Sequence, residues 1–573
     1  MRSLHNLRVS PPSPAPPQSA WLCPTDDAPP ASGAENVTPA AWRRFWPLLV
    51  LALILILVTV VRLRLAPSPL ERDEGEYAFI GQLMLQGIPP YKEAANIKFP
   101  GTYAAYAAIE TVFGQTPEGI HRGLLVVNLA TILLVCHLGR RFLGSRHTAV
   151  MAAAVYAVSS LSFSFLGPMA HATHFVVLFG LAGVALLLAA VRRNSIVGFA
   201  CAGFITGLAY MAKQSGFYFV PFGCLLLVSE HGWRTLSAPA MRALSYFLAG
   251  AFAPFAFTVL LFQRLGCLDD FLFWTFRYAS TYSLSLGALP EVFSLQGPKI
   301  YHLGLGWIFF CPCALLFLPP IWRRARPPRR TMLVLTLFLA LSLAGVSLGL
   351  YFRGHYWIQA LPAVALLSAL FFETVPTAIC HRLAPASAAA VASLLCLSLC
   401  GAVLAREAPR FFFTPPTQII WDTYPGCPFV ESVAIADYIQ RHSEPQDRIF
   451  VFGAEPQLYF YAGRRAAASN LYLYNLLGNQ PYVALMQRHM AAEVERNHPR
   501  FFIEAHQTYF PPPDMQRLIP LFRWKASYLA EHYRPVFMLD HQPSGSRLIQ
   551  GDSLLSYRSP YDCFVIVWEW ESP

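Results

Sequence analysis

Residues 45–61 read FWPLLVLALILILVTVV, an apolar run that with its flanks reaches the roughly 20 residues needed to cross a membrane. Ten further runs of this kind lie near residues 120–138, 148–166, 170–191, 195–212, 215–229, 242–263, 301–321, 331–351, 356–373 and 385–404. The pair between 195 and 229 could instead form one long kinked helix. The sequence therefore predicts an α-helical polytopic membrane protein with about eleven transmembrane helices.

The composition points the same way. Of 573 residues, 55% are hydrophobic and 13% are charged, whereas a soluble domain carries about 25% charged residues. This excludes a disordered chain, a disulfide-stapled mini-domain and a coiled coil. Residues 1–40 are the exception, because stretches such as PPSPAPP at 11–17 cannot bury a core and predict a disordered cytoplasmic tail.

The arginines indicate how the chain is oriented. Arg43 and Arg44 precede the first span, and basic residues then follow every second span. These residues are Arg140, Arg141, Arg146, Arg192, Arg193, Arg234, Arg242, Arg323, Arg324, Arg326, Arg329 and Arg330. By the positive-inside rule the N-terminus is cytoplasmic, and the net charge of +11 reports topology rather than a nucleic-acid partner.

The tail at 405–573 has a different texture from the spans. Helix-like stretches such as SVAIADYIQRHS alternate with β-rich runs such as DRIFVFG, PRFFIEA, PVFMLD and CFVIVWEW. This pattern predicts one small α/β domain, and eleven spans place it outside the cytoplasm. We thus expect a tail at 1–40, a transmembrane domain at 41–404 and an external domain at 405–573. Cys427 and Cys563 fall in that external domain, where an oxidising compartment would allow a disulfide.

The first external loop, 64–118, holds a dense group of acids. Glu71, Asp73, Glu74 and Glu76 follow a membrane exit, and residues 74–86 have helical periodicity. The pattern predicts a helix that lies at the membrane interface, with Asp73 and Glu74 at its N-terminus where carboxylates are favoured. The acids could form a solvated cap on this helix, or they could serve a function.

Lysine is rare in this chain, with only five residues. Lys98 and Lys213 nevertheless fall in predicted external loops or turns near the membrane, against the usual bias. Lysines in such places indicate an anionic ligand such as a phosphate. For Lys213 alone, a helix end that snorkels to the interface is an equally good explanation.

At this point the sequence resembles clan C glycosyltransferases, and more narrowly the branch with protein O-mannosyltransferases and the bacterial aminoarabinose transferase of lipid A. The resemblance starts at the Asp73–Ala78 stretch DEGEYA and covers most of residues 45–470. Further matching stretches are KFP at 98–100, LGRRFLG at 138–144, GLAYMAKQ at 207–214, HYWIQALP at 355–362 and the segments 447–453 and 461–464.

The resemblance implies an inverting hexosyl or pentosyl transferase in a bacterial inner membrane. It would move a sugar from a polyprenyl-phosphate donor to a lipid, protein or glycan acceptor at the external face, with no separate cofactor. Asp73 matches the family's aspartate and is the expected general base, with Glu74 beside it as a second catalytic candidate.

The cations placed on the external side would then bind the donor phosphate. Residues expected to bind it are Lys98, Lys213, Arg353 and His355. Arg353 and His355 could also be simple interfacial anchors. Tyr77 and Tyr356 are expected ring contacts for the sugar or the acceptor.

One stretch departs from the family pattern. Many relatives carry a second acid in the turn before the fourth span, whereas here the turn reads GPMAHATH at 167–174. His171 and His174 could contact acceptor or phosphate, or share a metal ion. A histidine pair of this kind is more often polar packing, so we expect no metal site.

Two other classes of polytopic protein stay open. A transporter or flippase for a lipid-linked or anionic substrate tends to place its charges at the bilayer midplane, often in repeated halves. A polysaccharide polymerase or ligase tends to use large arginine-rich external loops. Here the acids and lysines gather on one predicted face, which favours the glycosyltransferase.

Overall fold

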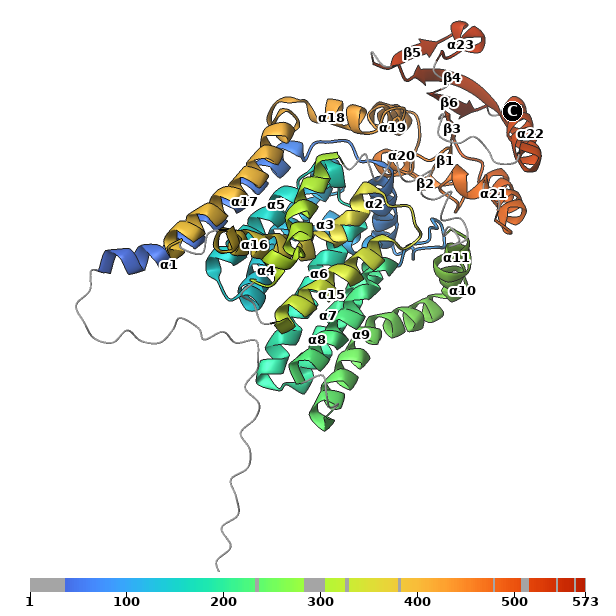
Figure 1. The fold of residues 1–573 in the computed structure, drawn as a ribbon. Helices are drawn as coiled ribbons and strands as arrows, with labels where there is room; N and C mark the ends of the chain where they lie inside the picture. Colours follow the sequence, from blue (N-terminus) through green and yellow to red (C-terminus); the bar gives the residue numbers. More distant parts are fainter. Residues whose placement is uncertain are drawn as a thin grey trace, which may run out of the picture.

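A computed structural model describes residues 37–231, 237–282, 304–324, 329–379, 383–477, 480–506, 515–542, 545–560 and 563–571. The tail predicted for residues 1–40 falls almost wholly outside these ranges. The first helix, α1, begins at Val37 and ends at Leu65. Figure 1 shows a bundle of long helices with a smaller domain, which contains a sheet, above one end of it.

The helical part, in chain order, contains α1, α2 (Arg72–Leu85), α3 (Gly101–Phe113), α4 (Pro117–Leu143), α5 (Arg146–Ser159), α6 (Ala172–Arg193), α7 (Ile196–Ala212), α8 (Phe219–His231), α9 (Ala238–Leu265), α10 (Leu268–Leu272), α11 (Ala279–Tyr282), α13 (Phe310–Leu316), α14 (Pro319–Trp322), α15 (Arg329–Val346), α16 (Leu361–Ile379), α17 (Pro385–Ala408) and α18 (Pro416–Thr423). Each of the eleven predicted spans coincides with at least one of these helices. Six described stretches are long and apolar enough to cross a membrane on their own: Phe45–Leu65, Pro117–Leu143, Ala172–Arg193, Ala238–Leu265, Leu361–Ile379 and Pro385–Phe413. The protein is therefore a multi-pass membrane protein, and the count of eleven crossings stays a prediction.

The ambiguous region at 195–229 forms two helices rather than one. α7 ends at Ala212, a 3-10 turn covers Gln214–Tyr218, and α8 begins at Phe219. The backbone of Lys213 is extended, with φ −157° and ψ 137°, so it cannot continue the helix. The break places Lys213 at a helix end.

Local capping signals set the joint between α4 and α5. Pro117 stands at the first turn of α4 behind the N-cap Thr116, whose side chain accepts a hydrogen bond from the backbone of Gly119. Gly144 ends α4 in the left-handed conformation, and Ser145 caps α5 at once. A sharp reversal follows, and α4 packs against α5.

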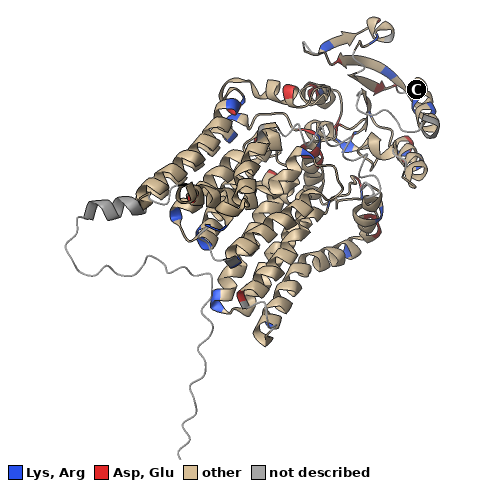
Figure 2. Cartoon of the chain, in the orientation of Figure 1, with Lys and Arg blue, Asp and Glu red and all other residues tan. Residues whose placement is uncertain are grey.

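Charged residues gather at helix ends, and the helices are nearly free of them along their lengths (Figure 2). α4 ends with Arg140 and Arg141, and α6 ends with Arg192 and Arg193. Both helices start at the opposite end, where their first turns contact residues of α2 and its neighbours. The arginines thus lie at the end of the bundle away from those acids, in the pattern on which the topology prediction rests.

The acids of helix α2 do not form a solvated cap, so that interpretation is wrong. Residues Glu74 to Leu83 are all buried, and Glu74 and Glu76 are both 0% exposed. α3 packs against one side of α2, and α20 (Gln457–Ala462) of the C-terminal domain packs against another. The acids are covered because the C-terminal part of the chain folds back over them.

The C-terminal domain is built on one mixed sheet. Its strands are β1 (Arg448–Phe452), β2 (Arg465–Ala466), β3 (Phe501–His506), β4 (Tyr533–Asp540), β5 (Arg547–Gln550) and β6 (Phe564–Trp570). They lie in the order β2-β1-β3-β6-β4-β5, with β1 parallel to β2 and β3 and the remaining pairs antiparallel. The helices of this domain are α19 (Glu431–Arg441), α20, α21 (Val483–Asn497), α22 (Met515–His532) and α23 (Ser553–Ser556). The predicted α/β domain is confirmed, and all four predicted strands are present.

Two details of the tail differ from expectation. The helix that begins at Pro385 runs on through a π-helical turn to Phe413, so residues 405–413 continue the last apolar helix. Cys427 and Cys563 are both free thiols, and Cys563 donates to the carbonyl of Gly426 at 3.0 Å. The disulfide is therefore absent from the structure.

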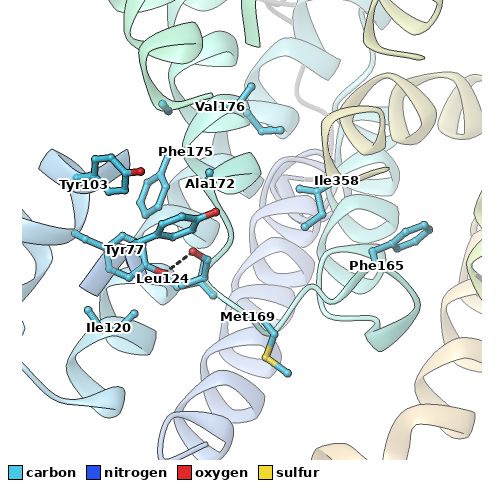
Figure 3. Packing of buried hydrophobic residues seen from close by; sticks show 14 of the residues in the cluster. Tyr77, Tyr103, Ile120, Leu124, Phe165, Met169, Ala172, Phe175, Val176 and Ile358 are labelled. Carbon is cyan, nitrogen blue, oxygen red and sulfur yellow. Dashed lines mark hydrogen bonds between the residues drawn. The ribbon is translucent and has the colours of Figure 1, made fainter. Parts of the chain in front are cut away.

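Aromatic rings pack the first turns of α2 against the bundle. Tyr77 lies against Tyr106 of α3 with ring centroids 5.3 Å apart, and Tyr106 lies against Phe175 of α6 at 6.0 Å. Figure 3 shows Tyr77 in this cluster, near Leu124 of α4. The packing joins α2, α3, α4 and α6 and holds the first turn of α2 in one position.

Gly75 allows α2 to approach α20 closely, because a Cβ there would lie 2.4 Å from the Cβ of Gln457 and 2.6 Å from its Cα. We expect Gly75→Ala to destabilise the protein by about 1–3 kcal/mol through overpacking. Thermal unfolding of the purified protein measures this. Gly401 of α17 has no atom within 4 Å of a built Cβ, so Gly401→Ala should be neutral or stabilising. Equal shifts in the two variants would contradict this close packing.

Candidate active site

The site starts from a reciprocal cap at the N-terminus of α2. The Glu71 carboxylate accepts from the backbone N–H of Glu74 at 3.0 Å, and the Glu74 carboxylate accepts from the backbone N–H of Glu71 at 3.1 Å. This capping box satisfies two N–H groups that a helix start leaves open. Burial, with the charges of Asp73 and Glu74, raises the pKa of Glu71 well above its usual range. The cap fixes the first turn of α2 and with it the direction of the Asp73 side chain.

Glu74 joins three separate segments. Its Oε1 accepts from Nε2 of His121 on α4 at 3.0 Å and from the backbone N–H of Ala170 at 2.5 Å. Nδ1 of His121 in turn lies 2.7 Å from the carbonyl of Ala66. Both carboxylate oxygens of Glu74 thus accept hydrogen bonds, and the side chain holds the turn before α6.

Glu76 is a second buried junction, one that the sequence analysis did not single out. Its Oε1 accepts from the Tyr103 hydroxyl at 3.0 Å, and its Oε2 accepts from Asn96 and from the hydroxyl of Tyr472. Lys98 lies 3.7 Å from Oε2. Burial raises the pKa of Glu76. Since Tyr472 belongs to the C-terminal domain, this carboxylate fastens that domain to α2.

Asp73 is the least buried of the acids at the start of α2. Its side chain is 14% exposed, and its oxygens lie 3.7 Å from Lys98 Nζ, 3.8 Å from His171 Nδ1 and 3.9 Å from His355 Nε2. Burial opposes its charge, but the nearby cations, Lys98 first, hold the pKa of Asp73 well below its usual range. Burial also lowers the pKa of His171 to about 4, so its ring is neutral near pH 7.

The two lysines come together because two loops approach closely. A Cβ on Gly101 would lie 2.5 Å from the carbonyl oxygen of Met211, so only glycine fits at the start of α3. Thr102 and Gln214 then donate across this contact, to the carbonyls of Ala212 and Ile97. The turn after α7 is thereby fixed beside the loop that carries Lys98.

Lys213 and Lys98 are each placed over an aromatic ring. Nζ of Lys213 lies 3.6 Å from the ring centroid of Tyr356, and Nζ of Lys98 lies 4.7 Å from that of Tyr77. Burial, together with Lys98 and Arg353, lowers the pKa of Lys213 to about 7. An anion that binds between these groups would restore the ammonium form, because opposite charges favour ionisation.

A polar cavity of about 80 Å³ collects these groups. Its lining comprises Asp73, Asn96, Ile97, Lys98, Lys213, Gln214, Arg353, His355, Tyr356, Tyr474 and Asn475. Six residues proposed from the sequence therefore meet here, from three separate parts of the chain. One water molecule needs about 10–15 Å³ of such a cavity, so there is room for a small group such as a phosphate.

Four proposed residues do not line this cavity. Tyr77 is 1% exposed and belongs to the aromatic core, where its ring faces Lys98. Glu74 forms the hydrogen bonds to His121 and Ala170, and His174 on α6 is 1% exposed. His171 stacks on His355, with ring centroids 3.9 Å apart, and its Nδ1 lies 3.8 Å from the Asp73 carboxylate.

Asp73, His171 and His355 form the group among the described residues that could hold a metal ion. Each offers one ligand atom, and these atoms lie within 4.8 Å of one another. Within the described part of the chain, neither ring nitrogen of His171 has a hydrogen-bond partner, and neither does Nδ1 of His355. As neutral rings they could accept a hydrogen bond from a bound hydroxyl, or they could coordinate a cation.

An apolar groove of about 670 Å³ is lined in part by residues close in sequence to those of the polar cavity. Pro100 and Met211 line it, and each lies two residues from a cavity lysine. Its other lining residues are Met84, Gly87, Ile88, Pro89, Pro90, Gly101, Ala104, Phe204, Leu208, Ala253, Pro254, Phe257, Thr258, Leu261, Phe262 and Leu265. Several of these, including Phe257 at 66% exposed, open onto the outer surface of the bundle. The groove suits a hydrocarbon chain that enters from lipid.

The sequence analysis missed the residues that come from far along the chain. Tyr472, Tyr474 and Asn475 stand in no motif, and nothing in their local pattern connects them to α2. Glu76 could have been singled out, because it belongs to the same DEGE run as Asp73. His121 carries no local signal either, since an isolated histidine in an apolar helix is usually a packing residue.

Comparisons with known proteins agree with this architecture. Residues 98–259 match the family described as dolichyl-phosphate-mannose-protein mannosyltransferase. A search of curated proteins finds no match for the chain.

Solved structures of similar fold cover nearly the whole chain. ArnT from Cupriavidus metallidurans, bound to undecaprenyl phosphate, has a TM-score of 0.54 at 16% identity and covers 93% of this chain and 98% of its own. The Archaeoglobus fulgidus oligosaccharyltransferase, tethered to an acceptor peptide, has a TM-score of 0.51 at 14% identity and covers 90% of this chain and 75% of its own. The chain is therefore a multi-pass membrane protein with the clan C glycosyltransferase fold.

Proposed function

We propose that this protein is a membrane glycosyltransferase that moves a sugar from a polyprenyl-phosphate donor to an acceptor hydroxyl, with Asp73 as general base. The observation that carries the proposal is the cavity that Asp73 shares with Lys98, Lys213 and Arg353. The lining of the apolar groove includes residues two positions from both lysines. Such a site offers cations for a phosphate, an apolar path for a lipid and one carboxylate for a hydroxyl proton.

The donor would divide between the two spaces. Its polyprenyl chain would lie along the apolar groove, and its phosphate would bind Lys98, Lys213 and Arg353. The ArnT structure holds undecaprenyl phosphate, which supports a lipid-phosphate ligand for this fold. The three cations would stabilise the negative charge that develops on the departing phosphate.

Asp73 would take the proton of the acceptor hydroxyl. The acceptor oxygen would form a bond to the anomeric carbon while the bond from that carbon to the phosphate oxygen breaks, and polyprenyl phosphate would leave with the electron pair. Attack from the face opposite the phosphate inverts the anomeric centre. Before the donor binds, the cations make Asp73 a weak base. A bound phosphate would neutralise them and raise the pKa of Asp73 toward a useful range.

The other histidines and acids would act through position. Glu74 would hold the turn that carries His171, in place of the catalytic part expected from the sequence. His355, which lines the cavity, and His171, which stacks on it, would keep the carboxylate of Asp73 in place. His174 would take no direct part, since it is buried away from the cavity.

The site lies at one end of the helices, which favours a reaction at a membrane surface over transport through the membrane. With the N-terminus cytoplasmic, that surface is the external face of a bacterial inner membrane. The tethered acceptor peptide of the archaeal oligosaccharyltransferase is a precedent for an acceptor at this fold. Lipid, protein and glycan acceptors all fit the chemistry proposed.

Asp73→Asn should abolish most transfer, because loss of a general base costs about a hundredfold to ten-thousandfold in rate. Protein in nanodiscs, supplied with radiolabelled undecaprenyl-phosphate sugars and a membrane extract as acceptor, measures this. Asp269→Asn removes an exposed aspartate of α10 and serves as the matched control. Full activity of Asp73→Asn would remove this carboxylate from the mechanism, and flux across proteoliposomes without chemical change would favour a transporter.

Binding of a sugar-phosphate donor should weaken as pH rises above about 7. The donor phosphodiester keeps one negative charge over this range, whereas Lys213, with its pKa lowered to about 7, loses its proton and its attraction. The loss is at most about tenfold per pH unit, because one proton is coupled. Lys213→Arg should flatten the profile between pH 6.5 and 8.5, and the exposed Lys92→Arg should not. If the donor affinity of the wild type did not change with pH, the proposed role of Lys213 in binding would be wrong.

We expect transfer to need no metal ion. A divalent cation bound to Asp73, His171 and His355 would share the Asp73 carboxylate with Lys98, whose Nζ lies 3.7 Å from it. Two positive charges at one carboxylate repel, which disfavours binding of the metal ion. Metal analysis of the purified protein should find well below one ion per chain, and EDTA should leave the rate unchanged. A stoichiometric ion that is lost in His171→Asn would show the opposite.

A further inference from the structure

The polar cavity has one wall that comes from the C-terminal domain. Among the described lining residues, Tyr474 and Asn475 alone lie beyond residue 404. Both belong to a short turn, Leu473–Leu476, between β2 and α21. We propose that this turn contacts the sugar of the donor and sets which sugar is accepted, an inference that rests on the proposed function.

The turn is held rigidly against the loop that carries Lys98. Ala95 donates its backbone N–H to the carbonyl of Ser469 at 3.0 Å, and Ala95 and Asn470 form an isolated parallel bridge. Leu473 donates to the carbonyl of Gly453 at 2.7 Å. Nearby, the guanidinium groups of the strands bind the Glu93 carboxylate, with Arg448 at 3.3 Å. These contacts make the turn a fixed wall, as a selective site requires.

Tyr474 presents an aromatic ring to the cavity. It stacks on Tyr472, with ring centroids 4.6 Å apart and planes at 28°. Tyr472 is itself anchored through its hydroxyl to Glu76. The ring of Tyr474 is half-buried, so one face of it is supported by Tyr472. A flat aromatic surface of this kind packs against the C–H groups of a sugar ring.

Asn475 presents an amide beside that ring. Its Oδ1 accepts from the hydroxyl of Tyr278 at 3.1 Å, and its Nδ2 donates to Oδ1 of Asn470 at 3.2 Å. An amide oxygen can accept twice and an amide nitrogen can donate twice. The side chain is 3% exposed, so a hydroxyl that reached it would meet a desolvated and oriented partner.

The charges of the cavity assign the two ends of the donor. Lys98, Lys213 and Arg353 are the lining cations, whereas the turn contributes only neutral groups. The phosphate would therefore lie toward the lysines and the sugar toward Tyr474. The turn supplies an uncharged part of the lining, so a sugar joined to that phosphate would lie against this wall. We infer an uncharged sugar, because the turn that would face it presents an aromatic ring and an amide and no charged group.

Binding in nanodiscs separates the phosphate from the sugar. The probes are undecaprenyl phosphate and undecaprenyl-phosphate glucose, titrated into wild type, Tyr474→Leu and Asn475→Ala. Both variants should bind the bare phosphate as wild type does, within about twofold, and should bind the glucose donor on the order of fivefold to tenfold more weakly, the worth of one hydrogen bond or ring contact. Tyr482→Leu, in the same domain but outside the cavity, is the matched control and should bind both lipids normally.

The gentler substitutions Tyr474→Phe and Asn475→Asp guard against misfolding. Asn475→Asp adds a negative charge to the wall and should shift preference from the glucose donor toward an aminoarabinose donor. Unchanged glucose binding in Tyr474→Leu and Asn475→Ala would overturn the inference, as would an equal loss of both lipids. A wild-type preference for the aminoarabinose or galacturonate donor would overturn the uncharged sugar. Failure of wild type to bind either probe would instead overturn the proposed function, and this inference with it.

Discussion

Four carboxylates at the start of one short helix, three of them nearly or fully buried, are the constraint on which the rest of this structure depends. Glu71, Glu74 and Glu76 lie out of water in the first turns of α2, and a buried carboxylate is costly unless it is paired and hydrogen-bonded. Their partners come from α3, α4, the turn before α6 and the C-terminal domain. Satisfying these acids therefore brings the distant parts of the chain to one place.

The same arrangement gives the acids two kinds of surroundings. Glu74 and Glu76 use both oxygens in hydrogen bonds to the fold, whereas Asp73 keeps its oxygens 3.7–3.9 Å from a lysine and two histidines. One acid of the group is thus left facing a cavity lined by cations. The groove beside it is apolar and opens to the outer surface of the bundle. A lipid-linked phosphate has the shape and charge that this pair of spaces fits.

The sequence indicated two lysines whose predicted place on the external side is against the usual bias for basic residues. Lys98 and Lys213 are lysines in a chain almost without them, and the structure brings both to the cavity of Asp73. The sequence could not predict that Glu74 forms hydrogen bonds with His121 and Ala170, because these bonds depend on how α4 and the turn before α6 pack against α2. The sequence could not predict the place of Tyr474 either. This residue lies about 400 positions after Asp73, and the fold of the C-terminal domain brings it to the cavity.

By itself, the amino-acid sequence determined the class of the protein and the order of its parts. Long apolar runs predict helices in lipid, because a helix satisfies its backbone hydrogen bonds within itself. The β-rich runs after them predict a separate sheet by their pattern. Only the tertiary structure showed which acids are taken up by hydrogen bonds to the fold, and that the C-terminal domain forms a wall of the cavity. Those assignments depend on burial and on distances of a few ångströms between residues far apart in the chain, and no local pattern records them.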